Sequence, residues 1–384
     1  MKKIYLDYAA ATPIDKQVLK SMEPFFSRQF YNPSALYLAG REVRQALEDA
    51  RALVAQNLGA RPAEITFTAG ATEANNLALR GIMQNYPDAE VLVSAVEHDS
   101  VLAPAELFNS RRIPVDKSGR VILDELEKMI SDKTALVSVG LVNNEIGTIQ
   151  SLHEIAKILK AVKYARTSNG PSKSEALPLL LHTDAAQAPS YFDLHVSRLG
   201  VDLLTINSGK IYGPKQSGAL YARAGIKLKP LILGGGQEDG LRSGTENVAG
   251  AVGLATAFDL AQNSRSLETR RLAELRRYFV DGIQTNMPLA VVNGSPKHSA
   301  PHIISVTFPG IDNERLMMEL DERGIQTATG SACNASSDKP SHVLEAIGLS
   351  DKQARSSLRF SFGRGVSEND INHTLKTLTQ LLKN

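Results

Sequence analysis

Residues 180–187 read Leu-Leu-His-Thr-Asp-Ala-Ala-Gln, and residues 201–210 read Val-Asp-Leu-Leu-Thr-Ile-Asn-Ser-Gly-Lys. Each stretch opens as a run of mostly apolar and β-branched residues, which is typical of a buried strand. The first run ends at Asp184, and the second is followed closely by Lys210. In open α/β sheets, ligands bind outside the carboxyl ends of the strands. The two stretches therefore predict an acid and an amine at one edge of a parallel sheet.

An acid and a lysine at such an edge are the combination that a pyridoxal 5'-phosphate (PLP) site uses. The lysine forms a Schiff base with the aldehyde, and the acid pairs with the pyridinium nitrogen. Lysine side chains are mostly exposed, and an Asp often caps a helix. A pair of this kind is more often a solvated lysine and a helix-capping aspartate, and it is the rest of the chain that favours a PLP site at Lys210 and Asp184.

The composition describes an ordinary globular protein. The chain has 384 residues, which favours two domains. Its 43 basic and 41 acidic side chains nearly cancel, which argues against binding to nucleic acid. No apolar run approaches the length of a membrane span, and the first residues do not resemble a signal peptide. We therefore expect neither a nucleic-acid nor a membrane partner.

The chain contains a single cysteine, Cys333. An internal disulfide is impossible, and this cysteine usage fits a cytoplasmic location. A lone cysteine is most often a small buried hydrophobe. Cys333, however, lies in Gly-Ser-Ala-Cys-Asn-Ala-Ser-Ser-Asp, residues 330–338, a composition that cannot form a core. The sequence therefore predicts an accessible thiol on a loop of about residues 329–340, whose thiolate is a nucleophile.

Strand and helix patterns alternate up to about residue 225, which predicts a doubly wound, mostly parallel sheet. A long helical pattern over residues 247–285 follows, and then further strands and helices with their own core. We predict two domains. The large cofactor-binding domain covers residues 15–255, and a smaller α/β domain, which carries the thiol loop, is formed by residues 1–14 and 256–384.

Polar residues follow three other predicted strands. The strand over residues 64–68 leads through Gly70, Ala71 and Thr72 into a helix, whose first amides lack partners and can bind an anion. His98 follows the strand over residues 91–94. The strand over residues 135–141 is followed by Asn143, Asn144 and Glu145. A glycine-rich segment over residues 234–245 allows the backbone to approach a ligand closely.

Taken together, these segments resemble the cysteine desulfurases of the NifS/IscS type, within the class V aminotransferase superfamily of fold-type I PLP enzymes. The resemblance covers almost the whole chain. Its motifs are Tyr-Leu-Asp-Tyr-Ala-Ala-Ala-Thr-Pro (5–13), Asn-Pro-Ser (32–34), Thr-Ala-Gly-Ala-Thr-Glu (68–73), Glu-His (97–98), Val-Asn-Asn-Glu-Ile-Gly (142–147), Asp-Ala-Ala-Gln (184–187), Lys-Ile-Tyr-Gly-Pro-Lys (210–215), Arg-Ser-Gly-Thr (242–245), Gly-Ser-Ala-Cys (330–333) and Ser-Ser-Leu-Arg-Phe (356–360). Each motif alone is weak evidence, but all of them in order are specific.

The resemblance implies a large domain with a mostly parallel seven-stranded sheet, and it implies roles for residues around PLP. Lys210, rather than Lys215, carries the Schiff base and moves the α-proton of the substrate. Asp184 keeps the pyridine nitrogen protonated, and His98 stacks on the ring. The remaining cofactor contacts are implied for Ala71 and Thr72 at the phosphate, and for Gln187 and Asn144 at the ring hydroxyl and the adjacent substrate region.

Further residues are implied to act on the substrate or across subunits. Arg359, with Asn32, clamps the substrate carboxylate, as a guanidinium favours. Thr245 reaches the phosphate of a partner subunit, which implies a homodimer. Cys333 attacks the substrate sulfur.

The segment before Lys210 departs from the family pattern. The family usually has Ser-Gly-His or Ser-x-His here, whereas this chain has Asn207, Ser208 and Gly209. The histidine that helps to hold the phosphate is therefore replaced by Gly209. Either Ser208 or Asn207 takes its place, and we expect weaker or differently arranged PLP binding. A polar insertion over residues 166–176 and a short C-terminal tail are further departures.

The resemblance implies a PLP-dependent cysteine desulfurase that converts L-cysteine to L-alanine and a Cys333 persulfide. The sulfur then passes to an acceptor protein, either an Fe–S scaffold or a relay for tRNA thiolation. Two alternatives remain open at this point. One is another class V PLP enzyme, an aminotransferase or a selenocysteine lyase. The other is a catalytically degenerate sulfur-relay or scaffold protein. No metal site is expected.

Overall fold

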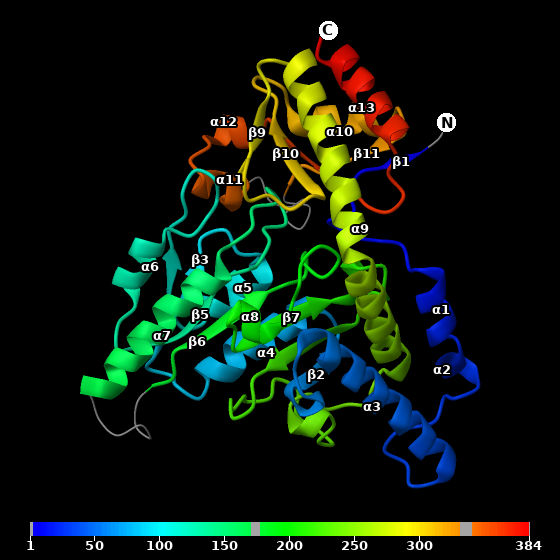
Figure 1. The fold of residues 1–384 in the computed structure, drawn as a ribbon, viewed down its shortest axis with the longest axis vertical. Coiled ribbons are helices and arrows are strands. Elements are labelled where there is room, and N and C mark those ends of the chain that lie inside the picture. The colour runs from blue at the N-terminus through cyan, green and yellow to red at the C-terminus, as the bar shows by residue number, and fades with distance from the viewer. Residues whose placement is uncertain (1–2, 170–176, 331–339, 384) are drawn as a thin grey trace.

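The structure is a computed structural model that describes residues 3–169, 177–330 and 340–383. It contains a large central sheet with helices on both faces and a smaller group of strands and helices at one end (Figure 1). A long helix, α9 (Val248–Asn286), runs through both parts.

The central sheet has seven strands, and six of them run parallel. In sheet order they are β2 (Ile65–Thr68), β8 (Gly218–Ala222), β7 (Leu203–Asn207), β6 (Leu180–Asp184), β5 (Thr134–Ser138), β3 (Glu90–Ser94) and β4 (Asn109–Ile113). Only β8 is antiparallel to its neighbours, β2 and β7. The predicted mostly parallel sheet of seven strands is confirmed.

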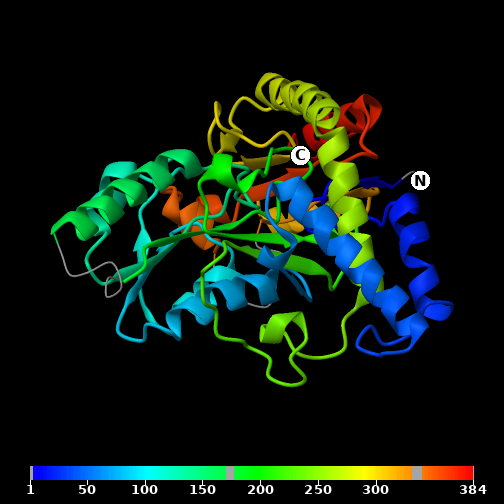
Figure 2. The same cartoon turned by 60° about the horizontal axis from the view of Figure 1, so that its bottom comes forward.

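The central strands are apolar throughout because both of their faces are covered. Leu136, Leu180 and Leu203 face one hydrophobic cluster, and the residues that follow each of them face the other cluster. The first cluster packs under α4 (Ala71–Met83) and α5 (Asp99–Ala105); the second packs under α3 (Leu38–Leu58), α7 (Leu152–Asn169) and the first half of α9. Figure 2 shows these helices on opposite sides of the sheet.

Several short elements complete this part of the chain. They are the helices α1 (Lys16–Met22), α2 (Pro24–Ser27), α6 (Leu123–Met129) and α8 (Val196–Leu199), and the 3₁₀ turns η1 (Pro62–Glu64), η2 (Ser208–Lys210) and η3 (Glu238–Gly240). Asp15 caps α1 by accepting a hydrogen bond from the Gln17 amide at 2.8 Å. Pro24 then begins α2 as a separate turn of helix.

A smaller antiparallel sheet in the order β12 (Ser357–Ser361), β10 (Ile303–Thr307) and β9 (Val291–Asn293) lies at the other end of α9. The helices α10 (Asn313–Asp321), α11 (His342–Ala346), α12 (Asp351–Ala354) and α13 (Glu368–Leu381) accompany it. Its core includes Phe279 of α9, Phe360 and Phe362. None of the helices in the described ranges is long and apolar enough to cross a membrane.

The N-terminal segment belongs to this second core. Strand β1 (Ile4–Tyr5) pairs in parallel with β11 (Ile325–Gln326), and Leu6 is fully buried among the residues of the smaller core. Asp7 then pairs with Arg359 of β12 at 2.7 Å. This pairing is the arrangement expected if residues 1–14 fold with residues 256–384. The exact domain boundaries stay a prediction.

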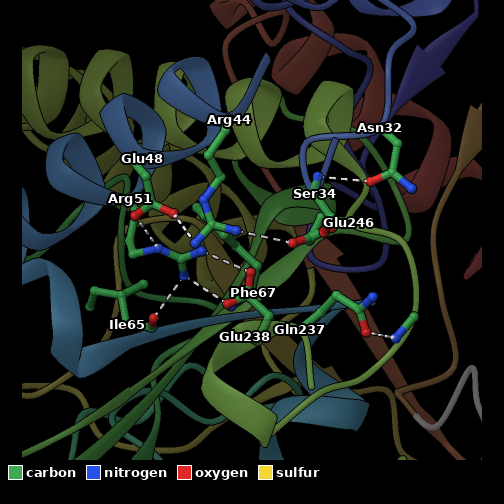
Figure 3. Close-up of polar contacts among 11 residues, drawn as sticks. Asn32, Ser34, Arg44, Glu48, Arg51, Ile65, Phe67, Gln237, Glu238 and Glu246 are labelled. Atoms are coloured by element: carbon green, nitrogen blue, oxygen red, sulfur yellow. Dashed lines mark hydrogen bonds and ion pairs between the residues drawn. The ribbon is translucent and has the colours of Figure 1, made fainter. Parts of the chain in front are cut away.

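The glycine-rich segment over residues 234–245 is anchored to the sheet edge by a buried ion pair. The Arg51 guanidinium of α3 donates two hydrogen bonds to the Glu238 carboxylate, at 2.7 and 2.8 Å, and a third to the Ile65 carbonyl at 2.9 Å (Figure 3). Glu238 also accepts from the Phe67 amide of β2 at 2.9 Å. The side chains are only 10% and 3% exposed. The pair therefore ties α3, β2 and the glycine-rich segment together.

We predict that Arg51→Met destabilises the fold by about 3 kcal/mol, because it leaves the buried Glu238 carboxylate without its counter-charge. Urea unfolding monitored by circular dichroism measures the effect. Lys128→Met is the matched control, since Lys128 pairs with Glu125 on the exposed surface of α6; it should cost less than about 1 kcal/mol. Equal effects of the two substitutions would contradict the prediction.

Candidate active site

A cavity of about 300 Å³ lies at the carboxyl edge of the central sheet. Asp184 enters it from the end of β6, His98 from the start of α5, Lys210 from η2 and Arg359 from β12 of the smaller sheet. The cavity thus lies between the two hydrophobic cores. It unites residues that lie up to 350 positions apart in the sequence, from Ala9 to Arg359.

The Asp184 carboxylate is held on both oxygens. Oδ1 accepts a hydrogen bond from the Ala186 amide at 2.8 Å, and Oδ2 accepts one from the Asn75 side chain at 2.7 Å. Asn75 is completely buried in α4 and also donates to the Ser100 hydroxyl at 2.8 Å. These bonds orient the carboxylate in the cavity wall.

His98 is the N-cap residue of α5, and its ring is held by the first turn of that helix. Nδ1 accepts a hydrogen bond from the Ser100 backbone N–H at 3.0 Å. In the neutral ring, the proton therefore resides on Nε2. Burial, together with the nearby Lys210 ammonium, lowers the pKa of His98. The imidazole is accordingly neutral at pH 7, and its Nε2 is a donor.

The backbone around Lys210 is fixed by the N-terminal segment. Thr12 donates from its amide and from its hydroxyl to the Gly209 carbonyl, each at 3.2 Å, and its hydroxyl accepts from the Tyr212 amide at 2.8 Å. Tyr212 has a left-handed backbone, with a φ of 64°, and its own hydroxyl accepts from the Arg364 amide at 2.7 Å. The turn that carries Lys210 is thus strained and held in place from outside.

A smaller cavity of about 210 Å³ lies at the start of α4. It is lined by Ala71 and Thr72 of the first turn of α4, and also by Asn207, Gly209, Lys210 and Lys215. Gly70, the N-cap residue, has a φ of 111° and a ψ of 179°, a conformation open only to glycine. Within the described part of the chain, no side chain caps α4, and a Cβ at Gly70 would meet no atom within 4 Å. The first amides of the helix therefore face open space, as an anion site requires.

Arg359 is 3% exposed, and its contacts with described residues leave the Nε–H without an acceptor. Nη2 donates to Asp7 at 2.7 Å, and Nη1 donates to the Asn144 carbonyl at 2.9 Å. Nε is buried and has no hydrogen-bond partner among the described residues. A buried guanidinium N–H without an acceptor, in the wall of a cavity, fits a carboxylate ligand.

Other predicted residues take different positions. Gln187 and Asn144 line the main cavity; the Gln187 amide donates to the Ala9 carbonyl at 2.9 Å. Ser208 is buried but lines neither cavity. Asn32 and Thr245 are exposed and do not line the cavities of their own chain. Cys333 lies outside the described residues.

The cavity also contains two buried acids that the sequence reasoning did not place in the site. Glu145 accepts a hydrogen bond from the Ser341 hydroxyl at 2.5 Å, and burial raises its pKa. Glu97 accepts from the Gly140 amide at 2.8 Å; burial, with a contribution from the Asp184 charge, raises its pKa to about 8. Asn75 was missed too, although it follows Ala71 by one helical turn. Each of these residues adjoins a motif that the sequence analysis singled out.

With this geometry established, similarity to known proteins identifies the family. A model of the family described as aminotransferase class-V matches residues 4–373. A cysteine desulfurase IscS from Dictyoglomus turgidum is 40% identical over 389 residues, which cover 100% of this chain and 95% of the relative. A human cysteine desulfurase is 38% identical, with coverage of 100% and 82%.

Solved structures agree. A NifS-like protein superposes with a TM-score of 0.90 at 32% identity over 100% of both chains. A structure described as SspA in complex with cysteine gives a TM-score of 0.80 at 34% identity, over 94% of this chain and 99% of the other. The chain belongs to the class V aminotransferase family, whose enzymes depend on PLP. Within that family its full-length relatives include cysteine desulfurases of the IscS type.

The residues present fit PLP. The cavities together offer an amine at Lys210, a carboxylate at Asp184 and an uncapped helix start at Ala71. These groups match the aldehyde, the pyridine nitrogen and the phosphate of the cofactor.

The pKa of Glu97 generates a pH-dependent prediction. Its ordinary value is 4.5, and the folded value is about 8. Between these values the folded chain keeps a proton that the unfolded chain has lost. The stabilisation from this group is therefore complete below about pH 4.5 and is lost as the pH rises through 8, by an amount on the order of 5 kcal/mol.

Glu97→Gln removes this titration and nearly preserves the shape of the side chain. We expect the wild type to lose stability relative to the variant when both are moved from pH 5 to pH 8.5, as measured by urea unfolding. Comparing the two chains at each pH cancels the titration of every other group. A difference in stability that does not change with pH would contradict the prediction.

Proposed function

We propose that this chain is a PLP-dependent cysteine desulfurase that converts L-cysteine to L-alanine and takes up the sulfur on Cys333. The observation that carries the proposal is the convergence of Lys210, Asp184 and Arg359 on one cavity. An amine, an acid and a carboxylate-binding guanidinium are what an enzyme needs to act on an amino acid with this cofactor. Similarity over the full length to cysteine desulfurases supports the same reaction.

When bound, PLP supplies an aldehyde for amines and a ring that accepts electron density from the α-carbon of an amino acid. Asp184 holds the proton on the pyridine nitrogen, since its carboxylate is already oriented by Asn75 and Ala186. Ala71 and Thr72 bind the phosphate through their backbone amides. Asn144, Gln187 and Asn207 contribute polar contacts around the ring.

Lys210 has two functions in this proposal. Its amine would hold the aldehyde of the cofactor, and when free it would move the proton of the substrate α-carbon. His98, which lines the cavity as a neutral ring, would face the cofactor and would have Nε2 available as a donor. The lowered pKa of His98 keeps it in this form at neutral pH.

Arg359 orients the substrate by binding its carboxylate. The unpartnered Nε supplies one hydrogen bond, and Asp7 and the Asn144 carbonyl keep the guanidinium in place. Because the carboxylate is fixed on one side, the α-proton and the thiol of L-cysteine point toward other parts of the cavity.

Cys333 acts as the sulfur acceptor. Its thiolate attacks the substrate sulfur, so that an S–S bond forms and the Cβ–S bond breaks. The electron pair of that bond remains on the substrate carbon, which takes up a proton and leaves as L-alanine. The persulfide then donates its outer sulfur to a second protein, an Fe–S scaffold or a tRNA-thiolation relay, in the cytoplasm.

We predict that Cys333→Ser abolishes L-alanine formation from L-cysteine, by at least about 100-fold, because no other thiol is available in the chain. The visible absorption of bound PLP should be unchanged. Incubation with L-cysteine, followed by measurement of L-alanine and of the mass of the protein, checks this. The wild type should gain one sulfur atom on Cys333 for each L-alanine formed in a single turnover.

The same experiment separates the alternative functions. An aminotransferase does not need the thiol, so unchanged turnover of an amino acid by Cys333→Ser would favour that class. A selenocysteine lyase would turn over L-selenocysteine and leave L-cysteine almost untouched. A wild-type chain with no visible absorption band, even after addition of PLP, would favour a degenerate relay or scaffold protein.

The active unit in this proposal is a homodimer. Thr245 and Asn32 do not line the cavities of their own chain, and an apolar segment beside them is exposed. The Arg44–Glu246 ion pair, at 3.3 Å, holds the segment next to Thr245 against α3 (Figure 3). The exposed apolar side chains between α2 and the start of α3 are Phe26 (62%), Phe30 (66%), Leu36 (83%), Tyr37 (56%) and Leu38 (74%). We propose that a second copy covers them and receives Thr245 at its phosphate.

Negative charges introduced into this exposed apolar segment should dissociate the dimer into monomers. We predict that Phe30→Asp combined with Leu36→Asp yields monomers by light scattering and weakens PLP binding, since each site then loses the residue from its partner. Leu289→Asp is the control, because Leu289 is equally exposed (79%) but lies before β9. Dimers that persist in the double variant would contradict this interface.

A further inference from the structure

The charge of the PLP phosphate needs a counter-charge that the assigned residues do not supply. A phosphate monoester carries about −1.5 to −2 charges at pH 7, whereas a helix start is equivalent to only about +0.5. Lys210 lines the phosphate cavity as well, but its amine is committed to the aldehyde. The inference below rests on the proposed PLP site and concerns which residue supplies the remaining charge.

The one acidic group of the first turn of α4 is already neutralised. Glu73 accepts a hydrogen bond from the Ala69 amide at 2.9 Å and forms an ion pair with Arg242 at 3.0 Å. Arg242 is thus committed to Glu73, and it does not line the smaller cavity. Glu73 is an acid, and the positive charge of Arg242 is already balanced by it, so neither supplies a counter-charge to the phosphate.

Neither of the two polar candidates from the sequence, Ser208 and Asn207, can supply a positive charge. Ser208 is fully buried and lines neither cavity. Its hydroxyl packs against Gly213, where an added Cβ would lie only 2.1 Å from the Ser208 oxygen. Asn207 does line the phosphate cavity, but its side-chain oxygen accepts a hydrogen bond from the Gly209 amide at 3.2 Å. Asn207 also carries no charge.

Lys215 is the remaining basic residue in the described lining of this cavity. Its Cγ would lie 3.6 Å from a Cβ at Gly209, so the two positions are direct neighbours. Because residue 209 has no side chain, nothing from that position stands between Lys215 and the cavity. Among the described residues, no carboxylate lies within ion-pair distance of the Lys215 amine. Its charge is therefore not already balanced by an acid.

We propose that Lys215 binds the phosphate of PLP and does so in the space that the absence of a side chain at Gly209 leaves open. The glycine and the lysine then form a functional pair: a lysine ammonium replaces the imidazole as the cationic phosphate ligand. An ammonium suits this role because it acts as a compact point charge on a long, adaptable stem.

Titration of the full-length apoprotein with PLP, followed by the visible absorption of the bound cofactor, tests the proposal without relying on activity. Lys215→Met should bind PLP about tenfold more weakly, the size expected for one partly solvated charge-assisted contact. Affinity for pyridoxal, which lacks the phosphate, should not change. Lys215→Arg should retain most of the PLP affinity. Lys227→Met, a control at an exposed lysine outside both cavities, should match the wild type.

A second variant tests the pairing with Gly209. A Cβ at this position meets only ordinary contacts, the nearest at 3.6 and 3.7 Å, so a side chain fits. Gly209→His should restore PLP affinity in the Lys215→Met background. Wild-type affinity of Lys215→Met for PLP, or an equal loss for PLP and pyridoxal, would overturn the inference. If the wild-type chain itself failed to bind PLP, the proposed function would fail instead, so the two failures are distinguishable.

Discussion

Two neighbouring parallel strands, β6 and β7, determine where the chemistry of this protein takes place. Parallel strands present their carboxyl ends at the same edge, and the register pairs Asp184 with Thr205. The Ala185 amide donates to the Thr205 carbonyl at 3.0 Å, which continues the pairing beyond the end of β6. An acid that ends β6 and an amine three residues beyond β7 must therefore meet in one place. Every other site residue is arranged around this constraint.

The second requirement is that the smaller sheet closes over that edge. Arg359 reaches the cavity only because β12 packs in the core formed with the second half of α9. Leu254 and Phe258 of this helix belong to the core of the central sheet, whereas Leu272 and Phe279 belong to the other core. With 39 residues, α9 is about 58 Å long and contributes to both. Movement of one core relative to the other therefore requires this helix to bend.

The sequence predicts much of this arrangement because its signals are local. Alternation of apolar runs and amphipathic helices predicts the parallel sheet, and polar residues after the runs indicate the cavity edge. The edge strand β4 was not expected, because Arg111 and Arg112 break its apolar pattern and its position depends on β3. The roles of Asn75 and Thr12 depend on contacts with residues more than 100 positions away, namely Asp184 and Gly209. Contacts over such distances cannot be predicted from the local sequence pattern. The same holds for which of Ser208, Asn207 and Lys215 binds the phosphate.

The pairing of β1 with β11 has a consequence for biosynthesis. Ile4 and Leu6 bury their side chains against residues that are translated more than 250 positions later. The Asp7 carboxylate likewise forms its ion pair only after Arg359 has been translated. While the central sheet is being made, residues 4–7 thus have no native partner in the second core. Completion of the cavity wall by Arg359 is consequently a late event in translation, and truncated chains that stop before β12 would lack this part of the site.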